Sequence, residues 1–178
     1  MIASLARFLA NRPILAPLAA LAASGALLGG AWAFQIFGGL APCPLCLYQR
    51  GPHWIVIVLA IAALPFARRL NASGLAVLIA LFGLVWLAGA GIAGFHVGVE
   101  QHWWKGLEAC GTGGIGDGAN FAELRAQILA APVVRCDEVP WSLFGISMAG
   151  YNFLASLALA SVAGTVAAHL WTRWETIR

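Results

Sequence analysis

The chain of 178 residues is 61% apolar and only 10% charged, whereas soluble globular proteins are about 45–50% apolar and about 25% charged. So few charged residues cannot cover the surface of a water-soluble domain of this length. The composition therefore predicts an integral membrane protein. The net charge of +3 is scattered along the chain without a basic run, so we expect no nucleic-acid partner.

Four stretches are long and apolar enough to cross a hydrocarbon core about 30 Å thick, which takes about 20 residues of helix. In chain order they are residues 14–37, 48–66, 75–95 and 148–171. The sequence therefore predicts an all-α membrane protein: a four-transmembrane-helix bundle. It forms one membrane domain over residues 1–178, with two outer loops at residues 38–47 and 96–147.

The distribution of basic residues predicts the orientation, because Lys and Arg near helix ends are retained on the cytoplasmic side. The two termini and the short turn between spans two and three carry six arginines and one acidic residue, Glu175. The opposite face carries four basic and six acidic residues. Both termini are therefore expected in the cytoplasm and both longer loops outside.

The first apolar stretch has an alternative interpretation as a cleavable signal peptide, because two arginines precede it and the small-residue triplet Ala31-Trp32-Ala33 lies near its end. The stretch exceeds the usual 7 to 15 apolar residues, and Pro13 suits the first position of a helix. Gly25 and Gly29 have the spacing of a helix-packing motif. A retained helix is the prediction, and cleavage would leave the orientation of the other spans unchanged.

Small residues recur every four positions in the last span, at Ser156, Ala160, Gly164 and Ala168. They predict close approach of another helix. In the long outer loop, Asn120 and Glu123 resemble a capping box, which predicts a short helix over residues 120–131. That helix could lie in the membrane interface or pack as an ordinary loop helix.

All four cysteines, Cys43, Cys46, Cys110 and Cys136, fall on the outer face of the predicted topology. Thiols outside the cytoplasm meet an oxidising environment, so the cysteines are expected to form disulfides. Three pairings are possible. The sequence favours Cys43 with Cys46, which are neighbours, and Cys110 with Cys136, which share one loop.

The C-x-x-C pair is typical of redox chemistry, because closing so short a loop adds little stability. If the second span begins near Cys46, the sulfur of that residue lies at a helix N-terminus with Arg50 four residues later. Both features favour the thiolate. The alternatives are a structural zinc site, purely structural disulfides and inert buried thiols. We predict no metal site, because the second pair has 25 residues between its cysteines and lacks a zinc knuckle.

Arg50 and His96 are candidate binding residues at the outer ends of spans two and three. Arg50 lies on the predicted outer side, so the retention of basic residues in the cytoplasm does not explain it. Its side chain could simply snorkel to the membrane interface. Together with His96 it could bind a polar carbonyl group that enters from the lipid. His53, His102 and His169 are expected to be interfacial or structural.

The run Cys43-Pro44-Leu45-Cys46-Leu47-Tyr48-Gln49-Arg50 resembles the signature of the DsbB family of bacterial disulfide-bond formation proteins. The resemblance covers nearly the whole chain. It includes the four spans, the His at the end of the third, the loop cysteines, and the run from Cys136 to Met148 with Trp141 and Gly145 in register. The glycine-rich segment 111–118 departs from the pattern, at the place where a partner would dock.

The resemblance implies a bacterial inner-membrane thiol:quinone oxidoreductase whose redox cysteines face the periplasm. Its partner would be a periplasmic thioredoxin-fold dithiol protein of the DsbA type, and its cofactor a membrane quinone, ubiquinone or menaquinone. By analogy, the partner attacks Cys110, the released Cys136 attacks Cys43, and Cys46 meets the quinone. Arg50 and His96 would hold the quinone carbonyls, with Met148 lining the pocket.

Two other classes of function compete with this interpretation. A transporter of a soft metal would need ligands along a path through the membrane, and we expect none between the interfaces. A structural membrane protein with disulfide-stapled loops would resist mild dithiol reductants, whereas relay disulfides would exchange quickly.

Overall fold

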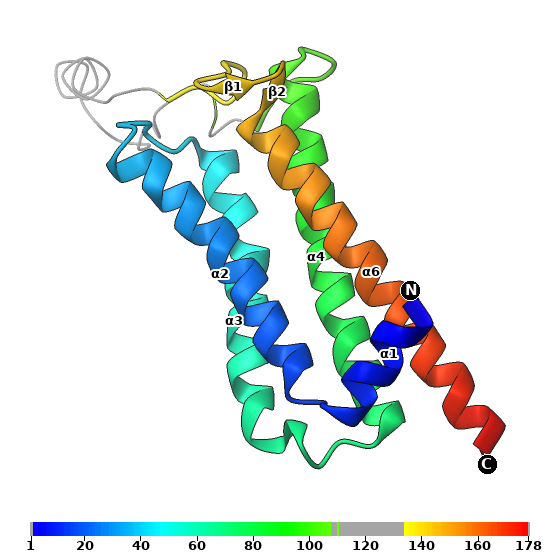
Figure 1. Cartoon of the computed structure of the whole chain (residues 1–178). Coiled ribbons are helices and arrows are strands. Elements are labelled where there is room, and N and C mark those ends of the chain that lie inside the picture. Colours follow the sequence, from blue (N-terminus) through cyan, green and yellow to red (C-terminus); the bar gives the residue numbers. More distant parts are fainter. Residues whose placement is uncertain (1, 108–109, 111–133, 178) are drawn as a thin grey trace, which may run out of the picture.

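Four long helices make up most of the computed structural model, which describes residues 2–107, 110 and 134–177. The helices are α2 (Leu15–Ile36), α3 (Pro44–Ala67), α4 (Ala72–Glu100) and α6 (Met148–Ile177). Each contains a segment long and apolar enough to span a membrane. The all-α bundle of four spans is therefore confirmed (Figure 1). The helix predicted at residues 120–131 lies outside the described residues.

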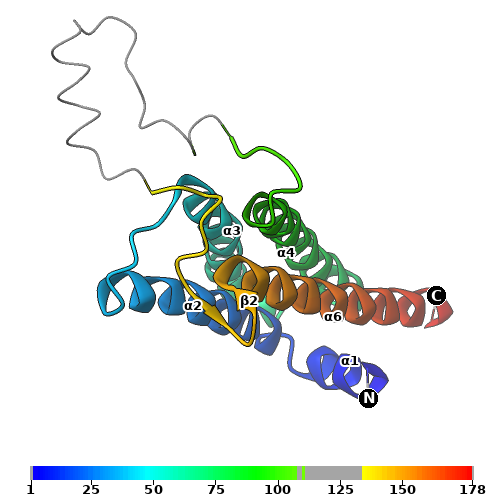
Figure 2. The same ribbon diagram turned by 90° about the horizontal axis from the view of Figure 1, so that it is seen from above.

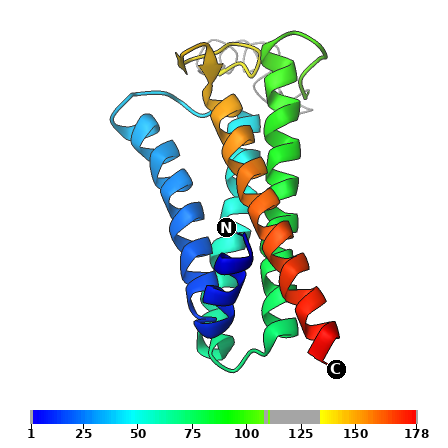
Figure 3. The same cartoon turned by 45° about the vertical axis from the view of Figure 1, so that its right-hand side comes forward.

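The two ends of the bundle differ. The connection between α2 and α3 and the strands β1 (Ser142–Leu143) and β2 (Ile146–Ser147) lie at one end, which carries the cysteines. The C-terminus and the turn at residues 68–71 lie toward the other end. A helix that the sequence did not predict, α1 (Ile2–Asn11), runs to that end from about the middle of the bundle (Figure 3). Helix α1 packs against α6. Which end faces the cytoplasm stays a prediction.

Helix α4 packs against two other spans: α6 makes the most extensive contact with it, and α3 packs on it and on α2 (Figure 2). Gly83 lets α6 approach closely, since a Cβ at that position would lie 3.1 Å from the Cβ of Ala163. Of the predicted small-residue stripe, Ser156 and Ala160 are buried. Gly164 and Ala168 are exposed instead and line a groove between α4 and α6.

Gly25 and Gly29 do not form the predicted packing face. Both are exposed on α2, and a Cβ added at either would meet nothing within 4 Å among the described residues. Helix α2 begins at Leu15, so Pro13 precedes it instead of opening it.

Two spans extend beyond their predicted ends on the side that carries the cysteines. Helix α3 begins at Pro44 rather than residue 48, because proline suits the first helical position and Cys43 caps the helix. Helix α4 continues to Glu100 rather than residue 95. Gly98 allows that last turn to be covered, since the Trp104 indole packs where a side chain would stand. The residues placed in the outer loop at 96–100 therefore form helix.

A two-residue turn joins β1 to β2, and β2 is followed directly by α6. Ser142 pairs with Ser147, and Leu143 with Ile146. The turn residues Phe144 and Gly145 have φ values of +51° and +76°, as the tight turn of an antiparallel hairpin requires. The hairpin thereby buries Ser147 at the top of α4.

Candidate redox site

Cys43 is the N-cap of α3. Its Sγ accepts a hydrogen bond from the backbone N–H of Cys46 at 3.1 Å. Both residues therefore lie in the first turn of the helix, where the unpaired N–H groups and the helix dipole favour negative charge. Cys43 is buried and Cys46 half-buried. A hydrogen bond with the Cys46 side chain and burial together raise the pKa of Cys43 above the ordinary thiol value.

Cys110 and Cys136 form the disulfide that the sequence favoured, with their Cα atoms 5.3 Å apart. The other favoured pair is not bonded in this structure, where Cys43 and Cys46 are free thiols. The sulfur of Cys43 instead faces the first turn of α3 and the ring of His96, with its Sγ 3.7 Å from Nε2. The structure thus combines one oxidised pair with one reduced pair.

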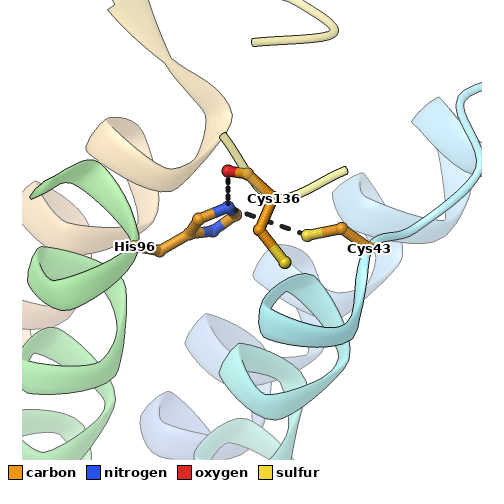
Figure 4. Close-up of side chains that lie close together, drawn as sticks. All are labelled: Cys43, His96 and Cys136. Atoms are coloured by element: carbon orange, nitrogen blue, oxygen red, sulfur yellow. Dashed lines mark hydrogen bonds between the residues drawn. The ribbon is translucent and has the colours of Figure 1, made fainter. Parts of the chain in front are cut away.

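One cysteine of each pair, Cys43 and Cys136, lies beside His96 (Figure 4). The Cys43 and Cys136 sulfurs and a ring nitrogen of His96 all lie within 4.8 Å of one another. The backbone carbonyl of Cys136 lies 3.1 Å from Nε2 of the same ring. One sulfur of each pair is therefore within a short movement of the other, and all three side chains are buried.

A chain of hydrogen bonds orients the His96 ring from below. The side-chain amide nitrogen of Gln49 donates to Nδ1 of His96 at 2.6 Å. Nε2 consequently carries the proton and donates to the Cys136 carbonyl. The Gln49 oxygen accepts from the Asn152 amide at 2.8 Å, and the Asn152 oxygen accepts from Nε2 of His53 at 3.0 Å. Ser156 adds a weaker bond to that oxygen. We call His96, Gln49, Asn152, His53 and Ser156 the polar chain.

The polar chain corrects the expectation that no ionisable group lies between the interfaces. His53 is the tenth residue of α3 and is 3% exposed, so it is buried well inside the span. Sequence reasoning missed Gln49 and Asn152 as its partners. Their signal was present, because Gln49 and His53 on α3 and Asn152 and Ser156 on α6 are each four residues apart. Polar groups so spaced in apolar spans share one helix face.

Replacing Asn152 by Ala is expected to destabilise the bundle by about 1–3 kcal/mol. The change leaves the Gln49 oxygen and the His53 N–H buried without their partner. Denaturant unfolding in mixed micelles, followed by the helical circular dichroism signal, measures this change in the free energy of unfolding. Ser161→Ala is the matched control, because within the part of the chain that the structure describes that exposed hydroxyl donates only to the backbone carbonyl of Leu157 on its own helix. Equal stability of both variants would contradict a structural contribution of the polar chain.

Arg50 faces a different helix from His96. Its guanidinium donates to the Gln35 side-chain oxygen on α2 at 2.8 Å, and the residue is half-buried. It follows Cys46 by one helical turn. Among the described residues no hydrogen bond joins Arg50 to His96. Sequence reasoning missed Gln35, because a single polar residue near the outer end of the first predicted span does not indicate a partner on another helix.

The third predicted binding residue, Met148, is half-buried at the first position of α6. Beside it the Ser147 hydroxyl donates to the carboxylate of Glu100. That carboxylate is buried, and its other oxygen lies 4.0 Å from Nε2 of His96. Sequence reasoning missed Glu100 and Ser147, since it placed both in a solvent-facing loop.

A groove of about 690 Å³ opens beside the disulfide. Its lining includes Cys110, Trp103, Trp104, Arg135 and Asp137. Trp103 is 69% exposed, and the guanidinium of Arg135 lowers the pKa of Asp137 to about 2. The groove therefore offers an aromatic and polar surface beside Cys110, whose side chain is itself buried.

Comparison with known proteins gives one consistent result. The model of the family described as disulfide bond formation protein DsbB matches residues 13–166. A relative from Methylococcus capsulatus named disulfide bond formation protein B is 32% identical over 76% of this chain and 82% of its own. Proteins of the same name from Nitrosococcus oceani and Polaromonas sp. are each 31% identical, over 72% and 77% of this chain and 76% and 80% of their own. No solved structure matches.

Proposed function

The chain belongs to the DsbB family of disulfide bond formation proteins, and we propose that it is a membrane disulfide oxidase that reoxidises a DsbA-type dithiol protein and passes the electrons to a quinone. The observation that carries the proposal is the meeting of the two cysteine pairs. The sulfurs of Cys43 and Cys136 lie within 4.8 Å of each other. Structural disulfides have no need of a second pair within exchange distance.

The first step uses the groove beside Cys110. A thiolate of the partner attacks the Cys110 sulfur, so a mixed disulfide forms and the bond between Cys110 and Cys136 breaks. Cys136 leaves as a thiolate next to the His96 ring. The Nε2–H of His96, which already donates to the carbonyl of Cys136, is placed to stabilise negative charge there.

The second step moves the electron pair toward the membrane. With Cys43 and Cys46 oxidised, the Cys136 thiolate attacks Cys43, a bond forms between these two sulfurs, and Cys46 leaves as a thiolate. The first turn of α3 and the charge of Arg50 favour that thiolate. Attack at Cys43 rather than Cys46 agrees with the raised pKa of Cys43, because the better leaving group departs.

The remaining exchanges restore the loop disulfide. The second thiolate of the partner displaces Cys110 from the mixed disulfide, so the partner leaves oxidised. The Cys110 thiolate then attacks Cys136 and releases Cys43. The product has a closed Cys110–Cys136 bond, as this structure has, and two thiols at the start of α3.

Reoxidation of Cys43 and Cys46 needs an acceptor of two electrons and two protons, and a bound quinone supplies that chemistry. Arg50 fits a quinone carbonyl, because the guanidinium has five N–H donors and gives one hydrogen bond, to Gln35, within the described residues. Both ring nitrogens of His96 are already engaged. The roles of His96 and Met148 at the quinone stay predictions, as does the choice between ubiquinone and menaquinone.

The same proposal fixes the orientation in the membrane. The four candidate spans make the chain a multi-pass membrane protein. We place it in the bacterial inner membrane, with the end that carries the cysteines in the periplasm and the termini in the cytoplasm. The arginine distribution and the need of the partner to reach Cys110 both support this orientation.

Arg50→Gln is expected to raise the apparent KM for quinone about 10- to 150-fold, because it removes a charged hydrogen bond of about 1.5–3 kcal/mol. Steady-state oxidation of the dithiol partner over a range of quinone concentrations measures the change. Arg69→Gln is the matched control, since Arg69 is exposed in the turn at the other end of the bundle. An unchanged KM in Arg50→Gln would mean that Arg50 only snorkels, and the quinone pocket would lie elsewhere.

A further inference from the structure

Three buried donor atoms converge from three separate segments of the chain. They are the sulfur of Cys43 at the start of α3, Nε2 of His96 on α4, and the sulfur of Cys136, all within 4.8 Å of one another. We propose that, once the Cys110–Cys136 disulfide is reduced, these three residues bind a soft divalent metal ion, Zn²⁺ above all. The set takes one cysteine from each pair, which the spacing of the cysteines along the sequence did not predict.

The distances suit such an ion with a small contraction. Bonds of about 2.3 Å from zinc to sulfur and about 2.0 Å to nitrogen place the ligand atoms of a tetrahedral site roughly 3.5–3.8 Å apart. The Cys43 sulfur already lies 3.7 Å from Nε2 of His96. Only Cys136 has to draw closer, and reduction frees its sulfur from Cys110 to do so.

The donor types also select the ion. Two thiolates and an imidazole favour Zn²⁺ and similar soft ions over Mg²⁺ and Ca²⁺, which prefer oxygen. The two thiolate charges compensate the charge of the ion, as a buried cation requires. Three protein ligands leave the fourth position open, and the buried carboxylate of Glu100 lies 4.0 Å from the His96 nitrogen.

The polar chain provides the support that a ligating histidine needs. When Nε2 binds a metal, the ring proton moves to Nδ1, which then must donate. The side-chain amide of Gln49, now donating to that nitrogen at 2.6 Å, can rotate to present its oxygen instead. Asn152 can rotate in the same way to keep its bond with Gln49.

A bound ion would hold the sulfurs of Cys43 and Cys136 and so block exchange between the two pairs. This consequence rests on the proposed relay, whereas the binding itself does not. Reduction of the Cys110–Cys136 disulfide makes the Cys136 sulfur available to the metal ion. A phosphine gives two electrons to the disulfide, the two sulfurs become thiols, and the phosphine becomes a phosphine oxide by taking oxygen from water.

Titration with Co²⁺ tests the site directly in the full-length chain in detergent. The double variant Cys46→Ser with Cys110→Ser leaves Cys43 and Cys136 as the only thiols, kept reduced by a phosphine. One Co²⁺ per chain should bind, with the sulfur-to-cobalt charge-transfer band and the visible bands of a tetrahedral ion, and Zn²⁺ should displace it. Adding His96→Gln should weaken binding at least about 100-fold. Adding His169→Gln, on α6 far from the cysteines, should change nothing.

Absence of stoichiometric binding, or equal binding with and without His96→Gln, would overturn the proposal. Helical circular dichroism establishes that each variant is folded. If His96→Gln is not recovered folded, Cys136→Ser in the background of Cys46→Ser serves the same purpose and should abolish the charge-transfer band. Because these readouts involve no dithiol partner or quinone, they can fail while the relay stands, and the relay can fail while they succeed.

Discussion

Cys43→Ser should reduce quinone-dependent oxidation of a dithiol partner to background while leaving the bundle intact. Cys43 offers the sulfur that lies within 4.8 Å of Cys136, so electrons from the loop disulfide lose their acceptor. The fold should survive, because a serine hydroxyl is a good N-cap and can accept the hydrogen bond that the Cys46 N–H now gives to sulfur. Turnover assays together with circular dichroism in micelles measure both effects.

The loop disulfide provides the control for that variant. Cys110 and Cys136 should still be bonded in Cys43→Ser and should still react once with a reduced partner, since the groove beside Cys110 is unchanged. Continued turnover, or failure to insert into the membrane, would instead favour a structural role for the first pair.

Cys136→Ala should form a stable covalent adduct between Cys110 and a partner that keeps only its attacking cysteine, supplied as a mixed disulfide with thionitrobenzoate. The free Cys110 thiolate attacks the partner sulfur, a disulfide forms between Cys110 and the partner, and thionitrobenzoate leaves as a thiolate. Neither Cys136 nor a second partner cysteine remains to break the new bond, so the adduct persists. A non-reducing gel shows it as a band that dithiothreitol removes.

The adduct depends on Cys110 as the residue that forms the bond. Cys136→Ala combined with Cys110→Ser should therefore show no adduct, and Cys136→Ala with Cys46→Ser should still show it. Absence of the adduct in the single variant, with the partner confirmed to carry thionitrobenzoate, would count against entry through Cys110.

The spans could be predicted from composition because each apolar stretch is about as long as the membrane is thick. Their ends could not, since apolarity stops at residue 95 while the helix continues to Glu100. That last turn is held by tertiary contacts, with Trp104 over Gly98 and the Ser147 hydroxyl on Glu100. Helix α1 escaped prediction because its ten residues are too short for a span.

The cysteine chemistry could be predicted from residue types and order, whereas the meeting of the two pairs could not. Spacing indicated which cysteines are neighbours, and the Cys110–Cys136 bond is confirmed. Cys136 lies near Cys43 because both contact the His96 ring. The sequence predicted that His96 binds a quinone, not that it contacts the cysteines. Gln49 bonds to His96, and Asn152 bonds to Gln49. In the sequence such supporting residues are visible only as polar residues on one face of an apolar helix, which is weak evidence.

The most direct test of the relay is oxidation of a reduced DsbA-type dithiol by the purified protein in lipid nanodiscs, with and without added quinone. The account predicts many turnovers with quinone and one quinone reduced for each dithiol oxidised, followed by the ultraviolet absorbance of the quinone. Without quinone, oxidation should stop once the disulfides already present are consumed. Sustained oxidation without quinone, or quinone reduction that persists in Cys43→Ser, would contradict the passage of electrons from Cys136 through Cys43 to the membrane.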